Sequence, residues 1–247
     1  MSLHLLMRIE APLVAFGDVM VDAIGPVTDT PSASMLTGLI ANALGWRREE
    51  RARHQRLQDR LIHAARLDRR AGRFVEFQTA KLGADDEGWT TRGRPEGRDG
   101  GAGTYLGPHI RRREHDADVS VAVALRLEPD AEDPTLGQIA AALDEPFRPL
   151  FIGRKPCLPT APLFDKLVEA EDLLAALALV PLARARKGEA DTVQIDMPAM
   201  AAMPPDGFHP VHVCDRRDWI AGVHAGDTVR WRASVPRADF VKAESAL

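Results

Sequence analysis

The chain has 247 residues, of which 45% are hydrophobic, so it can bury one sizeable core and a smaller appendage. Its formal net charge of −4 argues against a free-standing nucleic-acid binder, because such proteins are usually basic overall. Two cysteines are too few for a disulfide framework or a zinc site. No apolar run is long enough to span a membrane and no signal peptide is recognisable, so we expect a cytoplasmic protein with no cofactor and no metal.

The first 78 residues predict two strands and two helices. Apolar spacing, capping residues and glycine or proline breaks set the expected boundaries. In chain order we expect a buried strand (3–9), a loop (11–31), a helix (35–44) capped by Ser32 or Ser34 and ended by Gly45, a basic helix (48–65) and a weak strand (73–78).

Residues 79–110 differ from the rest of the chain, because they contain eight glycines and few aliphatic side chains. Such a segment cannot fill a core, and long excursions of this kind are usually functional or disordered. Beyond it, valine and leucine alternate cleanly over 119–127, which predicts a strand. A short helix (136–143) and a short strand (150–152) follow.

The resulting order is strand, helix, strand, long insertion, strand, helix, strand. This is the split βαβ pattern of an α+β, modified ferredoxin-like domain of the kind found in RNA-recognition modules. We expect that domain over 1–164, with 79–117 forming a long β-hairpin thumb. Residues 165–247 predict a smaller β-rich appendage, with a helix (166–177) and strands at 179–185, 192–196, 211–213 and 229–233.

A basic strand, 109–113, closes the glycine-rich excursion. On an extended arm Arg111 and Arg113 would project to one side and Arg112 to the other. Guanidinium groups suit phosphate oxygens and stack on unpaired bases, so RNA contact is at least as good an interpretation as a solvated hairpin.

Acid–base chemistry is a second interpretation of the same region. A metal-independent ribonuclease needs a base near a 2′-hydroxyl and a cation near the phosphate. His115 with the arginines of 111–113, or Tyr105 with His109, would supply such groups. We favour the alternative in which these residues only hold phosphates and stack on bases. Cys157, between two prolines, is interpreted as structural, and the glycines at 100–103 as a flexible loop.

Four segments resemble a known family. EAPLVAFG (10–17) is similar to the pattern G-P-x-Q-A-W-G, and PSASMLTGLIANALG (31–45) to P-x-x-S-G-L-L-G-L-L-G-A-x-L-G. REHDAD (113–118) falls where that family has R-x-Y-L-x-D-A. FIGRKPCLPTAPLF (151–164) resembles L-G-R-R-S-C-x-x-x-x-P-L-F, the most specific of the four. The chain therefore resembles the CasD subunits of type I-E CRISPR Cascade, within the repeat-associated mysterious protein superfamily.

This resemblance implies a non-catalytic subunit of an antiviral surveillance complex. Such a subunit binds and caps the 5′ handle of the CRISPR RNA and joins the backbone-forming Cascade subunit to the large PAM-reading subunit. It meets target DNA indirectly, through the complex, while a different subunit cuts the precursor RNA. The RNA contacts expected here are Ser34, Arg111, Arg112, Arg113, His115, Arg154 and Lys155.

Two details of the resemblance affect the site. His115 stands where the family usually has tyrosine, which keeps open an endoribonuclease that processes CRISPR repeat RNA with His115 or His109. Gly17, Gly38 and Gly153 would let backbone amides approach a phosphate, although for Gly38 we favour close helix packing.

Overall fold

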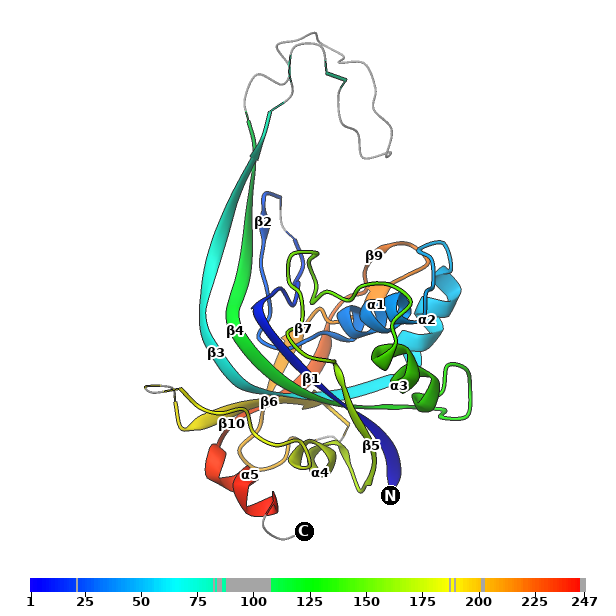
Figure 1. The fold of residues 1–247 in the computed structure, drawn as a ribbon, viewed down its shortest axis with the longest axis vertical. Helices are drawn as coiled ribbons and strands as arrows, with labels where there is room; N and C mark the ends of the chain where they lie inside the picture. The colour runs from blue at the N-terminus through cyan, green and yellow to red at the C-terminus, as the bar shows by residue number, and fades with distance from the viewer. Residues whose placement is uncertain are drawn as a thin grey trace.

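The structure is a computed structural model that describes residues 1–20, 22–81, 83, 86–87, 108–186, 188, 190–200 and 203–244. A curved sheet organises these residues, with helices against both of its faces (Figure 1). The strands are β1 (Ser2–Val14), β2 (Ile24–Gly25), β3 (Leu61–Ala80), β4 (His109–Leu127), β5 (Phe164–Ala170), β6 (Thr192–Pro198), β7 (His209–Val213), β8 (Arg217–Asp218), β9 (Val223–His224) and β10 (Thr228–Pro236). The helices are α1 (Ala33–Ala43), α2 (Arg51–Arg60), α3 (Leu136–Asp144), α4 (Leu173–Ala178) and α5 (Arg237–Glu244).

The main sheet has the order β5-β1-β4-β3-β6-β10-β7, and β2 adds in parallel to β4. Neighbours along the main path are antiparallel. Side chains alternate between two cores, because successive residues of a strand point to opposite faces. Leu5, Met7 and Ile9 of β1 join the core beneath α1, α2 and α3, whereas Leu6 packs with α4 on the other face. The clean alternation predicted over 119–127 is the central strand β4.

The first strand is longer than expected. It runs past Ile9 to Val14, which pairs with Asp116 of β4, so the predicted loop begins four residues too early. Pro12 suggested that loop, but it lies between the paired residues Ala11 and Leu13 and has no partner of its own in the ladder. Pairing on both sides of one proline therefore outweighs the missing backbone donor.

The longest feature is the β3–β4 hairpin, paired from Leu61 with Leu127 to Ala80 with His109. The predicted helix over 48–65 is wrong after Arg60, where α2 ends and β3 begins. Tertiary pairing overrides helical propensity here, because residues 61–67 are hydrogen-bonded to the buried strand β4. The tip of the expected thumb, including Tyr105 and the glycines at 100–103, lies outside the described residues.

The capping predictions describe the helix ends well. Ser32 Oγ accepts a hydrogen bond from the Met35 amide (3.2 Å) and starts α1, and Gly45 follows the helix with φ +79°. At α3, Thr135 and Gln138 form a reciprocal capping box.

Several expectations after residue 145 are wrong. Residues 150–152 are not a strand, although Leu150 and Ile152 are buried in the core. The predicted helix over 166–177 is replaced at its start by β5, which pairs with the edge of β1, and only α4 remains helical. Residues 179–185 form no strand. The predicted strands at 192–196, 211–213 and 229–233 are present within β6, β7 and β10.

The later strands continue the sheet of the first ones. β6 pairs with β3, and β10 and β7 extend it further, while β5 begins at Phe164 and returns to β1. The division into 1–164 and 165–247 stays a prediction. Among the described helices, none is long and apolar enough to cross a membrane.

Candidate nucleic-acid interface

Two of the four family-like segments lie side by side. The Ala15 amide donates to the Ile152 carbonyl (3.1 Å), and the Thr160 amide donates to the Glu10 carbonyl (2.8 Å). Segment 10–17 is therefore bound along segment 151–164, although more than 130 residues separate them in the chain.

Gly153 makes the tightest backbone approach in this region. Its φ is +81°, and a Cβ atom at this position would lie 1.8 Å from the Ala15 carbonyl oxygen. No side chain fits such a turn. Next to it, Cys157 is fully buried and its amide donates to the Arg154 carbonyl (2.9 Å). Burial raises the pKa of the Cys157 thiol, which fits its structural interpretation.

Arg154 ties this turn to the base of the hairpin. Its guanidinium donates to the Glu114 carbonyl (2.6 Å) and to the Gly25 carbonyl (3.0 Å). Nη1 also lies 3.4 Å from His115 Nε2. Burial, followed by the nearby Arg113, lowers the pKa of Arg154. Arg154 therefore holds the fold together and also presents a cation at the edge of a pocket.

That pocket, of about 410 Å³, joins three of the family-like segments. The N-terminal part of α1 contributes Ser34, whose Oγ lies 3.1 Å from Ser32 Oγ. Gly38 also faces it, and a Cβ added there would meet only Trp219 within 4 Å, at 3.7 Å. The expected close helix packing at Gly38 is therefore wrong. The pocket is lined by Ala15, Gly17, Ser32, Ser34, Met35, Gly38, Leu39, Asn42, Phe151, Gly153, Arg154, Arg217 and Trp219.

His115 lies beside this pocket rather than in its lining. It is 2% exposed, and its ring stacks on Phe74 with 5.3 Å between ring centroids. Burial, followed by the charge of Arg154, lowers the pKa of His115. The imidazole is therefore neutral at neutral pH and packed into the base of the hairpin.

The three arginines at 111–113 of the hairpin differ in their exposure to solvent. Arg111 and Arg112 are exposed and Arg113 is half-buried. They lie opposite Gln78, Phe77 and Glu76 of β3, and the Arg112 amide also donates to the Ala23 carbonyl (2.8 Å). As in any strand, Arg111 and Arg113 share one face and Arg112 takes the other. Lys155 is exposed on the turn after Arg154 but does not line the pocket.

Two arginines of β3 are neutralised by carboxylates within the chain. Arg73 donates to Asp116 (2.7 and 3.0 Å) and to Asp29 (2.9 Å), and Arg70 also bonds Asp29. Burial raises the pKa of Asp29, but the two arginines outweigh it and the net shift is downward. This network stabilises the base of the hairpin. Arg111 and Arg112, nearer the start of β4, are exposed and form no ion pair with any residue in the part of the chain that the structure describes.

The comparisons with known proteins identify the family of the chain. The Cas5d model of the CRISPR-associated protein (Cas_Cas5) family matches residues 4–226. The chain belongs to the Cas5 family. It is 28% identical over 178 residues to the CRISPR system Cascade subunit CasD of Escherichia coli (strain K12), covering 72% of this chain and 76% of that protein. The resemblance to CasD predicted from the sequence is confirmed.

Two solved structures share the fold of this Cas5 chain. One, described as a CRISPR RNA-guided surveillance complex, has a TM-score of 0.64 at 23% identity and covers 94% of this chain and 89% of that one. The other, described as a crystal structure of a Cas protein, has a TM-score of 0.60 at 23% identity, covering 95% and 96%.

Two pocket residues escaped the sequence analysis of this Cas5 chain. Arg217 and Trp219 come from the segment expected to form an appendage, and no motif surrounds them. Only the fold of the chain brings them over α1. Within the described part of the chain, no three His, Cys, Asp or Glu residues gather in a way that could hold a metal ion.

Proposed function

We propose that this chain is a non-catalytic subunit of a CRISPR antiviral surveillance complex, and that it binds and caps the 5′ handle of the CRISPR RNA. The observation that carries this proposal is the convergence of segments 10–17, 31–45 and 151–164 on one pocket. These segments carry the similarity to CasD, so the part of the chain that resembles a Cascade subunit also builds the binding site.

The RNA-binding unit comprises β1, α1, α2, β3, β4, α3 and β5, a modified ferredoxin-like arrangement. The antiparallel order β5-β1-β4-β3 and the helices in both crossovers support this assignment. In this proposal the β3–β4 hairpin is the base of a thumb over 79–117. The predicted domain at 1–164 and appendage at 165–247 divide the chain at the start of β5, and the strand that completes this order is the first element of the appendage segment.

The proposed RNA contacts fall into two groups with different tasks. Arg111, Arg112 and Lys155 are exposed and hold phosphates, since their charges reach solvent. Ser34 and Arg154 act at the pocket, where bases of a single strand can be read or stacked. Arg113 and His115 lie between these groups, at the base of the hairpin.

The hairpin also carries the proposed contact with the backbone-forming subunit. Val75, Phe77 and Ile110 are 54%, 59% and 40% exposed on its arms. Exposed apolar side chains gathered on an extended element are typical of a protein interface. Through this contact and the bound RNA, the subunit joins the backbone to the large PAM-reading subunit and meets target DNA only indirectly.

The alternative function is a metal-independent endoribonuclease that processes CRISPR repeat RNA. The cation of Arg154 beside His115 favours it, because a base and a cation are then adjacent. The burial of His115 opposes it, since a 2′-hydroxyl must reach the imidazole. We therefore rank it second.

A binding assay tests both functions. The full chain, alone and co-expressed with the other subunits encoded beside it, is incubated in EDTA with labelled RNA carrying the host repeat. We expect a gel shift without cleavage. Arg111→Gln and Arg112→Gln should each weaken binding and lower the slope of log affinity against log salt by about 0.7, because each removes one phosphate contact.

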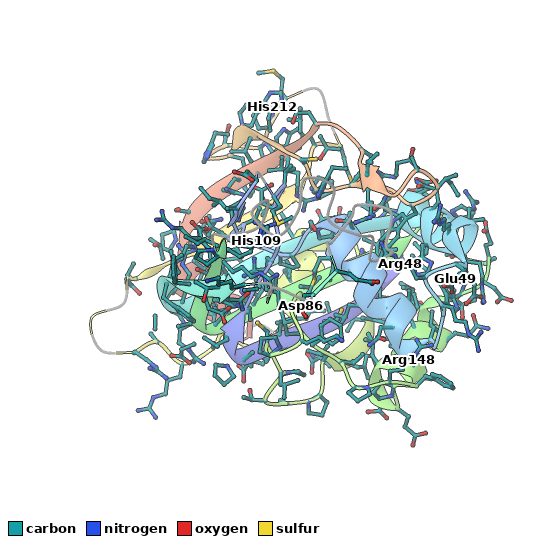
Figure 2. The ribbon with its side chains drawn as sticks, turned by 90° about the horizontal axis from the view of Figure 1, so that it is seen from above. Arg48, Glu49, Asp86, His109, Arg148 and His212 are labelled. Carbon is teal, nitrogen blue, oxygen red and sulfur yellow. The ribbon has the colours of Figure 1, made fainter. Side chains whose placement is uncertain are left out.

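Arg48→Gln is the matched control. Arg48 is exposed and lies well apart from His109 and the hairpin (Figure 2). It should leave affinity and salt slope unchanged. Cleavage at one position that is lost on changing His115 or His109 to alanine would replace the handle cap with the ribonuclease. Absence of a shift with both the chain and the co-expressed complex would reject RNA binding itself.

A further inference from the structure

One wall of the pocket is held rigidly by two glutamines of α2. Gln58 is fully buried, and its Nε2 donates to the Arg217 carbonyl (2.8 Å). Its Oε1 accepts from the Arg217 amide (3.0 Å) and from Trp219 Nε1 (3.1 Å). Gln55 Oε1 accepts from the Trp219 amide (2.9 Å). Both the backbone and the indole of Trp219 are thus fixed from α2.

The surroundings of the indole leave part of it facing the pocket. His54 packs against it with 4.8 Å between ring centroids and 31° between ring planes. The indole Cη2 atom would lie 3.7 Å from a Cβ atom added at Gly38. Arg217 places its guanidinium 5.6 Å from the ring centroid. Trp219 is half-buried and lines the pocket together with Arg217.

We propose that Trp219 is a stacking platform for one unpaired nucleobase of the bound RNA. This inference rests on the proposed function and names what occupies that site. Because the ring is already immobilised, little further conformational entropy is lost when a base stacks on it. The pocket volume of about 410 Å³ suits a small planar group with part of its sugar.

Nucleic acid is the occupant that the surrounding chemistry favours. The same pocket presents the guanidinium of Arg154, the hydroxyl of Ser34 and the open backbone around Gly17. Cations and hydroxyls next to one fixed indole match a nucleotide, whose phosphate, sugar and base need these three kinds of partner. Because stacking uses the π-face, the site should tolerate exchange of one base for another.

The test combines changes in the protein with changes in the RNA. The assembled complex, or the chain if it binds alone, is titrated with handle RNA in which each nucleotide in turn is made abasic. For the wild type we expect one position whose abasic form binds roughly 5- to 100-fold more weakly, while a base exchange there has a smaller effect. In Trp219→Ala the intact RNA should bind as weakly as the wild type binds that abasic RNA, and the abasic change should have no further effect.

Two matched variants accompany this measurement. Trp219→Phe keeps an aromatic ring but loses the bond to Gln58, and it should retain the abasic effect in reduced form. Phe147→Ala removes an aromatic side chain that is 74% exposed and absent from the pocket lining, and it should bind like the wild type.

The outcomes separate the two proposals. If the wild type binds the RNA and the abasic change weakens binding as much in Trp219→Ala as in the wild type, the stacking platform is overturned. The proposed handle-binding function is then unaffected. The proposal is also overturned if Trp219→Ala weakens the binding of every RNA by the same factor, whichever nucleotide is abasic. Trp219 would then affect binding only through the fold. Failure of the wild type to bind handle RNA removes the proposed function and this inference together.

Discussion

At the scale of single residues, an arginine's role is decided by its partner rather than by its place in a basic run. Residues 46–73 contain ten arginines, of which Arg48 is exposed whereas Arg60 and Arg66 are fully buried. The guanidinium of Arg60 donates to backbone carbonyls of 129–134, and that of Arg66 pairs with Asp68. The sequence shows the number of charges, whereas their accessibility depends on the fold.

Gly153 gives a prediction at this scale. In Gly153→Ala, the new methyl group meets the Ala15 carbonyl at 1.8 Å on a backbone with φ +81°. We expect the free energy of unfolding to fall by roughly 2 kcal/mol or more, measured by urea denaturation. Gly17→Ala is the control, because nothing lies within 4 Å of a Cβ there. Equal stability of the two variants would contradict this view of the turn.

At the scale of elements, local sequence signals set some helix ends, whereas pairing with a distant strand sets others. The ends of α1 and α3 follow from Ser32, Gly45 and Thr135, because a cap depends on a few neighbouring residues. The change from α2 to β3 at Arg60 has no such signal. Leu61, the first residue of β3, pairs with Leu127 of β4, which lies 66 residues farther along the chain. The strand therefore becomes favourable only when the hairpin closes.

The capping box of α3 can be tested directly. Thr135→Ala removes the oxygen that accepts from the Gln138 amide (3.3 Å) and should lower the free energy of unfolding by about 1 kcal/mol. Thr135→Ser keeps that oxygen and should restore most of the loss. If thermal and urea denaturation rank the serine variant no better than alanine, the cap contributes nothing.

A buried ion pair holds the segment after α4 against the sheet. Arg66 and Asp68 are 0% and 1% exposed, with 2.6 Å between Nε and Oδ1. Arg66 also donates to the Leu177 and Val180 carbonyls, and the Ala183 amide donates to Asp68. These bonds explain why residues 179–185 form no strand: side chains of β3 satisfy part of their backbone.

Removing the acid of this pair should be costly. Asp68→Ala leaves the Arg66 charge buried without its partner, and we expect a loss of about 3–5 kcal/mol in the free energy of unfolding. Arg56→Ala breaks the pair with Glu132 on the exposed side of α2 and should have little effect. Similar urea midpoints for the two variants would contradict the stabilising role of the buried pair.

At the scale of the whole molecule, one sheet connects residues from both ends of the chain. His63 of β3 is buried, its ring nitrogen Nε2 lies 3.1 Å from the Pro31 carbonyl, and its own carbonyl accepts from Arg230 of β10. Burial, followed by the charge of Arg230, lowers the pKa of His63 well below its usual value. One neutral imidazole therefore lies where three segments meet, namely the residues before α1, strand β3 of the hairpin and strand β10.

This arrangement predicts a pH dependence of stability. Below about pH 6.5 the unfolded chain binds a proton on His63 that the folded chain does not, so stability falls as pH decreases. His4 and His115, whose pKa values burial also lowers, act in the same direction. Each such histidine can lower the free energy of unfolding by up to about 1.4 kcal/mol for each pH unit below about 6.5.

Urea denaturation at pH 7.5 and 5.5 measures this effect. The His63→Gln variant keeps an amide nitrogen that can donate to the Pro31 carbonyl. Its free energy of unfolding should fall less between pH 7.5 and pH 5.5 than that of the wild type. An unchanged pH dependence in that variant would rule out His63 as a contributor.

The sequence by itself determined the family and most of the secondary structure. Alternation over 119–127, the serine cap and terminal glycine of α1, and the four family-like segments are local patterns, and local patterns can be read from neighbouring residues. They also include Ser34 and Arg154, which line the pocket. The extent of β1, the start of β3 and the strand β5 were decided by partners far along the chain.

Only the tertiary structure decided the composition of the pocket. It brought Arg217 and Trp219 over α1, buried His115 against Phe74, and separated exposed arginines from those that are paired with carboxylates. The physical reason is that burial, charge pairing and close approach arise between segments that meet only after folding. A sequence shows which groups are available for a binding site, and the folded sheet and its helices select which of them line the pocket.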